Sequence, residues 1–222
     1  MSSESVVADE IEAPADAAVN RRVSRRWLAL LGVLLAVAAA YTGGYLTPAL
    51  RAPGDHSPEA GFARDMSTHH AQAVDMAMMA YPKATLPEVR ILAADIAMTQ
   101  ENQIGVMHTW LLNWHDSVNS LDPPMSWMPD GPEALHDGLM PGMATPQEMD
   151  KLRNATGKDV DILFCQLMLR HHLGGIHMVD GVLAVSHNQQ VRDLATAMKT
   201  GQSGEVEVMH HLLDQLGAKP LS

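Results

Sequence analysis

The stretch FARDMSTHH at residues 62–70 returns as FCQLMLRHH at residues 164–172, an offset of 102 positions. The same offset aligns residues 62–111 with residues 164–213 without a gap, and 14 of the 50 aligned pairs are identical. An ungapped repeat of this length indicates a duplicated structural unit. The repeated pairs with metal-ligand chemistry are Met66/Met168, His69/His171, His70/His172, Met76/Met178, Met107/Met209 and His108/His210.

Each copy of the repeat is predicted to be a helical hairpin, because apolar residues recur at helical spacing and Pro or capping residues mark the ends. The predicted helices are 58–80 and 85–114 in the first copy, and 159–185 and 188–216 in the second. Thr85 and Glu88 are predicted to form a capping box at the start of the second helix. Neither hairpin can bury its apolar stripe alone, so the two should close into an all-α four-helix bundle with a pseudo-twofold axis.

The segment between the two copies, residues 117–144, is rich in Pro, Gly and Met and is predicted to be a long crossing loop. A second capping box, Thr145 with Glu148, predicts a short helix that ends near residue 155. The loop holds two Met-x-x-Met pairs, Met125 with Met128 and Met140 with Met143. These methionines are expected to anchor the loop on the bundle, with recruitment of Cu(I) as the alternative.

An apolar run of 20 residues, Trp27 to Leu46, carries no charge and is long enough for a helix to cross a membrane. Four arginines directly before it place residues 1–26, a predicted disordered tail, in the cytoplasm and the rest of the chain outside. We therefore expect a single-pass membrane anchor at 27–46, a linker at 47–57 and an extracytoplasmic bundle at 58–217. A cleaved signal peptide, which would give a secreted protein, is the alternative.

The formal net charge is −11, and the excess of acidic residues lies after the apolar run. An acidic surface argues against a nucleic-acid partner and is compatible with attraction of cations. Cys165 is the single cysteine, so the chain forms no internal disulfide and offers no thiolate zinc site.

Helical-wheel geometry turns both histidine pairs toward the bundle interior. Phe62, Met66 and Met76 lie on one stripe of the first helix, and His69 and His70 flank the centre of that stripe by about 50° on either side. The third helix repeats this arrangement. The inward polar positions of the second and fourth helices are Gln100, Gln103, Gln202 and Glu205. Buried polar groups are costly without partners, so an organised polar core is expected.

Imidazole and thioether groups together suit Cu(I), whereas zinc and magnesium have little use for methionine. Copper is therefore the predicted partner of the bundle. The candidate metal ligands are Met66, His69, His70, Met76, Met107, His108, Met168, His171, His172, Met178, Glu205, Met209 and His210. No catalytic residue is predicted, because the sequence shows no Ser-His-Asp or Cys-His arrangement.

Two other functions fit parts of the pattern. The His and Gln side chains could bond to one another, which would make the bundle a metal-free interaction module. A ferritin-like oxidoreductase would need inward Glu residues and two Glu-x-x-His motifs. Only Glu207-x-x-His210 has that spacing, and Glu207 points away from the stripe, so a di-iron site is disfavoured.

The motif Phe62-x3-Met66-x2-His69-His70 resembles the bacterial domain-of-unknown-function family 305. The second copy and the connecting Met140-Pro141-Gly142-Met143 resemble it too, over about residues 58–217 in all. The resemblance implies a ferritin-like four-helix bundle in a secreted or membrane-anchored protein, with copper binding in some members. The family's usual acidic residue is present at Glu205 but is replaced by Gln103 in the first copy, which would alter the first half-site.

Overall fold

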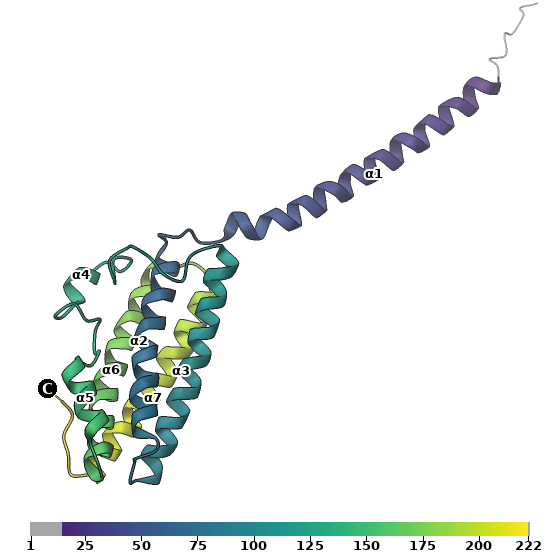
Figure 1. The fold of residues 1–222 in the computed structure, drawn as a ribbon. Coiled ribbons are helices and arrows are strands. Elements are labelled where there is room, and N and C mark those ends of the chain that lie inside the picture. The colour runs from purple at the N-terminus through teal and green to yellow at the C-terminus, as the bar shows by residue number, and fades with distance from the viewer. Residues whose placement is uncertain (1–14, 222) are drawn as a thin grey trace, which may run out of the picture. The chain divides into compact units, whose positions relative to one another are not determined.

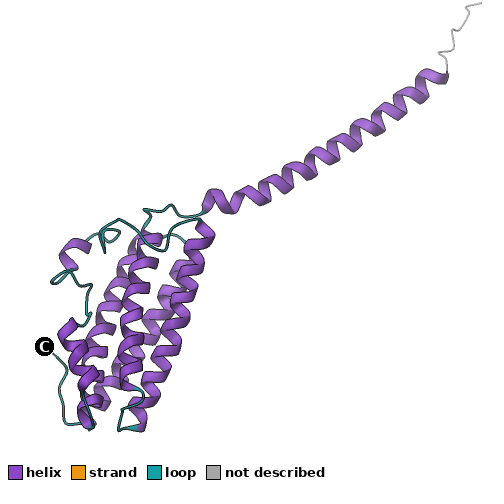
Figure 2. Cartoon of the chain, in the orientation of Figure 1, coloured by secondary structure: helices purple, strands orange, loops and turns teal. Residues whose placement is uncertain are grey.

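The computed structural model describes residues 15–221, with side chains placed for residues 26–44 and 52–221. The chain divides after Arg51 into two units. The first is the helix α1 (Ala15–Arg51), and the second contains α2 to α7 (Figures 1 and 2). No strand occurs within the described residues, which confirms the all-α prediction.

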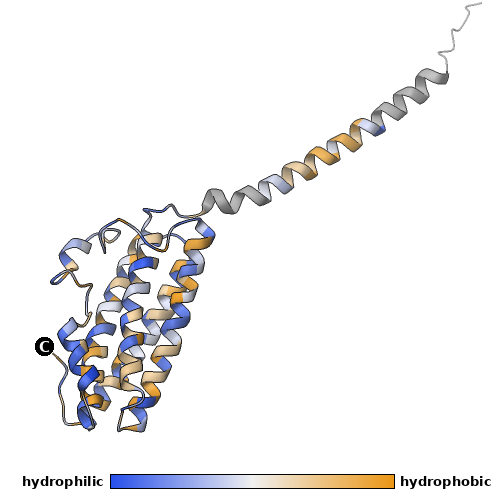
Figure 3. Cartoon of the chain, viewed as in Figure 1, coloured by the Kyte–Doolittle hydropathy of each residue, from blue (hydrophilic) through white to orange (hydrophobic). Residues whose placement is uncertain are grey.

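The helix α1 contains the predicted apolar run. Arg26–Gly44 has a mean hydropathy of 1.8 and no buried residue, and Figure 3 colours most of this stretch as hydrophobic. This stretch is long and apolar enough to cross a membrane, and signal sequences share the same length and composition. α1 also includes residues 15–26 and 47–51, which the sequence assigns to the tail and the linker. Residues 1–14 of that tail lie outside the described residues.

The four long helices of the second unit form the predicted bundle. They are α2 (Pro58–Ala80), α3 (Pro87–Trp114), α6 (Lys158–Val185) and α7 (Gln189–Gln215). α2 pairs with α3, α6 pairs with α7, and the two hairpins meet mainly through α2 and α6 (Figure 1).

Contacts at the two ends of the bundle show the relative directions of the helices. Asp161 in the first turn of α6 binds Thr85 in the α2–α3 turn. At the other end, Ser186 after α6 donates a hydrogen bond of 2.6 Å to Glu59 at the start of α2. α6 is therefore antiparallel to α2 and parallel to α3, as in ferritin-like bundles with a single long crossover.

The start of α3 differs from the prediction. Thr85 is not its N-cap: α3 begins at Pro87, after Leu86, and its own residues supply no side-chain cap. Instead the buried carboxylate of Asp161 accepts the backbone N–H of Thr85 at 2.9 Å and that of Leu86 at 3.1 Å. The predicted capping box of Thr85 with Glu88 is wrong, because a residue of α6 supplies the acceptor that a local side chain usually provides.

The bundle core consists of two apolar clusters with a polar layer between them. The first cluster, on the side of the α2–α3 turn, includes Met76, Phe164, Met168 and Met209. The second, toward the opposite end, includes Phe62, Met66, Met107 and Met178. The polar layer contains His69, His70, Gln100, His171, His172 and Gln202, none more than 5% exposed.

The connection from α3 to α6 holds the short helices α4 (Gly131–Ala134) and α5 (Pro146–Asn154), and α5 begins with the predicted capping box of Thr145 and Glu148. Three loop methionines, Met125, Met128 and Met140, are at most 6% exposed and belong to the second apolar cluster. They anchor the connection on the bundle, as expected.

Residues 139–145 of this connection, termed the strap, lie against α2 and α6 beside the polar layer. The side chain of Gln72 exchanges two hydrogen bonds with the backbone of Ala144, at 2.9 and 2.6 Å. A Cβ atom on Gly174 would lie 1.9 Å from the carbonyl oxygen of Pro141. Glycine at position 174 therefore allows the strap backbone to rest directly on α6.

Candidate metal centre

The four histidines of the repeat gather in one layer of the bundle. His69 of α2 and His171 of α6 are at the centre, with ring centroids 3.8 Å apart and planes inclined by 30°. The ring centroid of His70 lies 6.5 Å from that of His69, and the centroid of His172 lies 6.3 Å from that of His171. The packing of α2 on α6 therefore brings together the two histidine pairs, which the sequence places on two different helices.

Each of these imidazoles bonds through Nε2 to an oxygen. His69 Nε2 lies 2.9 Å from the carbonyl oxygen of Pro141, and His171 Nε2 lies 3.0 Å from the carbonyl oxygen of His69. A carbonyl oxygen can only accept, so these two Nε2 atoms donate. In a neutral imidazole the proton is then on Nε2, and Nδ1 carries the lone pair.

His70 and His172 show the same pattern, but their partners are side chains. His70 Nε2 lies 2.7 Å from Oε1 of Gln103, and His172 Nε2 lies 2.6 Å from Oε2 of Glu205. Both partners are on the neighbouring helix of the same hairpin, at a sequence separation of 33 residues. The second hairpin thus has a carboxylate where the first has an amide.

The Nδ1 atoms of His69, His70 and His172 are buried and have no hydrogen-bond partner among the described residues. Buried polar atoms rarely stay unpaired, and each unpaired one costs free energy. An imidazole that donates one nitrogen to an oxygen and leaves the other nitrogen unpaired has the arrangement typical of a metal-ligating histidine.

Burial favours the neutral form of His69, His70 and His171. The pKa of His69 is lowered to about 4 and that of His70 to about 3, mainly by loss of hydration and in smaller part by nearby imidazoles. Burial also holds the pKa of His171 well below its usual value of 6.5. Neutral imidazole is the form that binds a metal ion, so no proton must leave before binding at neutral pH.

Two amides complete the layer. Neither the nitrogen nor the oxygen of the Gln100 side chain has a hydrogen-bond partner among the described residues, and the same holds for Oε1 of Gln202. Gln202 lies over Gly175 of α6, where a Cβ atom would come within 2.5 Å of Oε1. The layer therefore contains unpaired acceptors from α3 and α7 as well as from the histidine-bearing helices.

The candidate ligands divide into those that adjoin the layer and those that do not. Met66, Met76, Met107, Met168, Met178 and Met209 are fully buried in the apolar clusters on its two sides. Met66 and Met168 lie one helical turn before the histidines of their helices. Glu205 is half-buried and reaches His172.

His108 and His210 lie outside this arrangement. Both are exposed, on α3 and α7, and neither belongs to the buried histidine layer. No group of three or more His, Cys, Asp or Glu side chains gathers as a metal site within the residues that the structure describes. A metal centre in this bundle would therefore depend on imidazoles supplemented by methionine.

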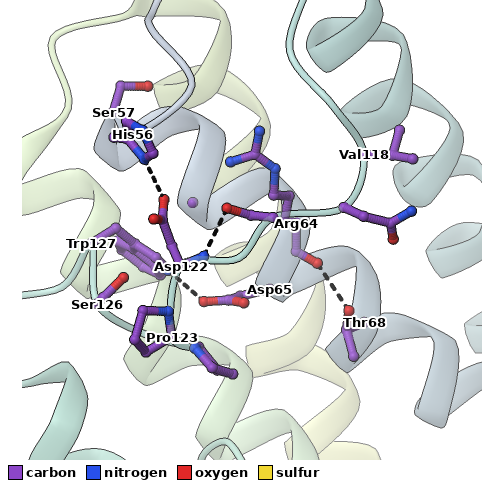
Figure 4. Close-up of a pocket in the computed structure, with 14 residues that line it drawn as sticks. His56, Ser57, Arg64, Asp65, Thr68, Val118, Asp122, Pro123, Ser126 and Trp127 are labelled. Carbon is purple, nitrogen blue, oxygen red and sulfur yellow. Dashed lines mark hydrogen bonds and ion pairs between the residues drawn. The ribbon is translucent and has the colours of Figure 1, made fainter.

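A second polar site, which the sequence analysis missed, lies between the start of α2 and the loop after α3 (Figure 4). It is a cavity of about 460 Å³. Asp65 accepts hydrogen bonds from the backbone N–H of Met125 at 2.7 Å and from the Trp127 indole at 2.8 Å, and burial raises its pKa. His56 lies 2.7 Å from Asp122. The residues that line the cavity come from segments about 60 positions apart, so no local motif in the sequence indicates the cavity.

The bundle domain matches a known protein family. The model for the domain of unknown function DUF305 matches residues 59–213. The chain belongs to the DUF305 family. This match confirms the resemblance noted from the paired His-His motifs.

Solved structures share the fold. A DUF305 protein from Streptomyces coelicolor, inferred to be secreted, is 43% identical, with a TM-score of 0.71 over 76% of this chain and 99% of that one. A DUF305 fragment from Deinococcus radiodurans is 28% identical, with a TM-score of 0.59 over 71% and 96%. CopM in a Cu(I)-bound form is 26% identical, with a TM-score of 0.56 over 72% and 96%. No curated protein matches this chain.

Proposed function

We propose that this DUF305 protein is an extracytoplasmic copper-binding protein that buffers Cu(I) in the histidine layer of its bundle. The observation that carries the proposal is the set of unpaired, buried Nδ1 atoms on His69, His70 and His172. Their Nε2 atoms are occupied by oxygen acceptors, which fixes the tautomer and orients the lone pairs within the core.

The chemistry of the surroundings favours Cu(I) over harder ions. The apolar clusters on the two sides of the layer include Met66, Met107, Met168 and Met209, all fully buried. Cu(I) accepts thioether and imidazole ligands together. The likeness to CopM, solved with Cu(I), agrees with this choice.

The proposed location of the protein rests on the apolar helix α1. Arg26–Gly44 can span a membrane, and the arginines before it favour a cytoplasmic N-terminus. The proposal places the bundle outside, held by a single-pass anchor, with secretion after signal cleavage as the alternative. An alkaline phosphatase fusion after residue 222 should be active in both cases, and the mass of the mature protein separates them.

One observation favours a metal-free module instead. The Nε2 atoms of all four histidines already have oxygen partners, as a purely structural network would require. The di-iron alternative gains nothing, because His210 and Glu207 are both exposed.

The deciding experiment compares wild type with a variant in which the four layer histidines are changed to Gln together. Full-length protein in detergent is titrated with Cu(I) against a chelator of known affinity. We expect the variant to bind at least about 100-fold more weakly while its helicity is retained. The matched control changes the exposed His56 and His187 to Gln and should bind like wild type. Equal affinity of the four-histidine variant and wild type would overturn the proposal, because the layer histidines would then be structural and form a hydrogen-bonded network.

A further inference from the structure

A surface cavity of about 240 Å³ lies beside the strap. Its lining includes His136, Met140, Met143, Glu148 and Arg170. The histidine is exposed, Met143 is half-buried, and Met140 is only 6% exposed. One imidazole and two thioethers thus border the same opening.

Met140 connects this cavity with the interior. It lines the cavity and also belongs to the apolar cluster that contains Met66 and Met107. Met143 packs against that same cluster. The cavity and Met66, which lies one turn before His69 on α2, thus adjoin the same methionine-rich cluster.

The strap also makes direct contact with the histidine layer. The carbonyl oxygen of Pro141, the residue after Met140, accepts the hydrogen bond from His69 Nε2 at 2.9 Å. The cavity is therefore separated from a layer histidine by one residue of backbone.

Two carboxylates, Asp137 and Glu148, line the cavity, and Glu148 is already engaged. Glu148 receives two hydrogen bonds from the Arg170 guanidinium, at 2.9 and 2.6 Å. The same guanidinium lies 3.4 Å from the carbonyl oxygen of Met143, which ties that residue in place. Besides the exposed Asp137, the remaining side-chain donors are one imidazole and two thioethers, and these three suit a soft monovalent ion.

We propose that this cavity is the loading site for Cu(I): His136 and Met143 capture the ion, and Met140 passes it toward the histidine layer. The inference rests on the proposed function. Transfer proceeds by ligand exchange, in which one thioether or imidazole bond to copper forms as another breaks. The ion remains Cu(I) throughout, so no oxidant or reductant takes part.

The test measures the rate of loading separately from affinity. Full-length protein in detergent is mixed rapidly with a Cu(I)–chelator complex, and the absorbance of that complex is followed over a range of protein concentrations. The variants are H136Q with M143L, and M140L alone, which keep side-chain volume nearly unchanged. The matched control is M128L, from the other Met pair of the same connection, whose residue does not line this cavity.

We expect both loading variants to take up copper at least about tenfold more slowly, with an equilibrium affinity within about twofold of wild type. Since the affinity is unchanged, release into excess chelator should slow by the same factor. Wild-type rates in the variants would overturn the loading role and leave the proposed function intact. A loss of equilibrium affinity would overturn it too, by making these residues part of the tight site. Failure of wild type to take up copper would overturn the proposed function itself.

Discussion

His69 and His171, equivalent residues of the two repeat copies, stack against each other with ring centroids 3.8 Å apart. The pseudo-twofold axis of the bundle therefore passes between them. Each half of the layer also contains a second histidine with a side-chain partner: His70 with Gln103, and His172 with Glu205. The duplication has therefore produced one polar layer whose two halves differ, with an amide in one and a carboxylate in the other.

The free energy of unfolding should fall in mild acid. The pKa of His69 is about 4 and that of His70 about 3 in the folded chain, against 6.5 for the exposed group. The unfolded chain therefore binds more protons below pH 6.5, so stability is complete above that value and is lost as the pH falls toward 4. Each histidine contributes a slope of about 1.4 kcal/mol per pH unit.

Urea unfolding of metal-free protein at about pH 7.5 and about pH 5 measures this slope. The variant H70Q should show a shallower dependence, whereas H108Q, at an exposed position, should match wild type. An unchanged slope in H70Q would show that this imidazole is accessible to protons in the folded protein.

Glu205 should strengthen metal binding at its end of the layer. Its carboxylate accepts the hydrogen bond from His172 Nε2, which raises the basicity of the other ring nitrogen. The variant E205Q keeps the shape and loses the charge, and we expect about 10- to 100-fold weaker Cu(I) binding in chelator competition. E207Q, at an exposed position of the same helix, is the control. Equal losses in the two variants would point to general surface charge instead.

Glycines 174 and 204 should respond oppositely to alanine. A Cβ on Gly174 would lie 1.9 Å from Pro141 O, so G174A must displace the strap and should cost about 1–3 kcal/mol. Gly204, inside α7, has nothing within 4 Å of the corresponding position, so G204A should stabilise the chain by about 0.5–1 kcal/mol. Chemical denaturation measures both values. Stabilisation by G174A would mean that the strap is not seated on α6.

The side chain of Asp161 should contribute more to the free energy of unfolding than a helix cap at the surface does. Its carboxylate caps α3 from α6 by accepting the N–H groups of Thr85 and Leu86, so D161A leaves both donors without this acceptor. A loss of about 1–3 kcal/mol in the free energy of unfolding is expected. D159A, at an exposed position of the same helix turn, should change stability by less than about 0.5 kcal/mol. Similar effects of the two substitutions would contradict the capping role.

Much of the fold could be predicted because its signals are local. Prolines at 58 and 82 bound the first helix of the bundle, and the predicted limits 58–80 match α2 as observed. The wheel positions of His69 and His70 correctly indicated burial, since a stripe spaced at 3.6 residues turns the same face inward wherever the helix packs.

Other features depend on tertiary contacts that no local pattern contains. The wheel gives the facing side of each helix but not the axial alignment of the hairpins, so the stacking of His69 on His171 could not be derived. His108 and His210 lie at the edge of their stripes, on α3 and α7. Those helices contact each other far less than α2 and α6 do, and both histidines stay exposed.

The polar layer also limits how the two hairpins can dock. Apolar clusters alone tolerate sliding, because one methionine or alanine can replace another as a neighbour. A slip of one helical turn, about 5.4 Å, would move the imidazoles of one hairpin among the apolar side chains of the other and separate His171 from the backbone of His69. The buried polar residues cost the most free energy to bury, and they thus exclude every alignment of the hairpins but one. They give a bundle of flexible side chains a single register.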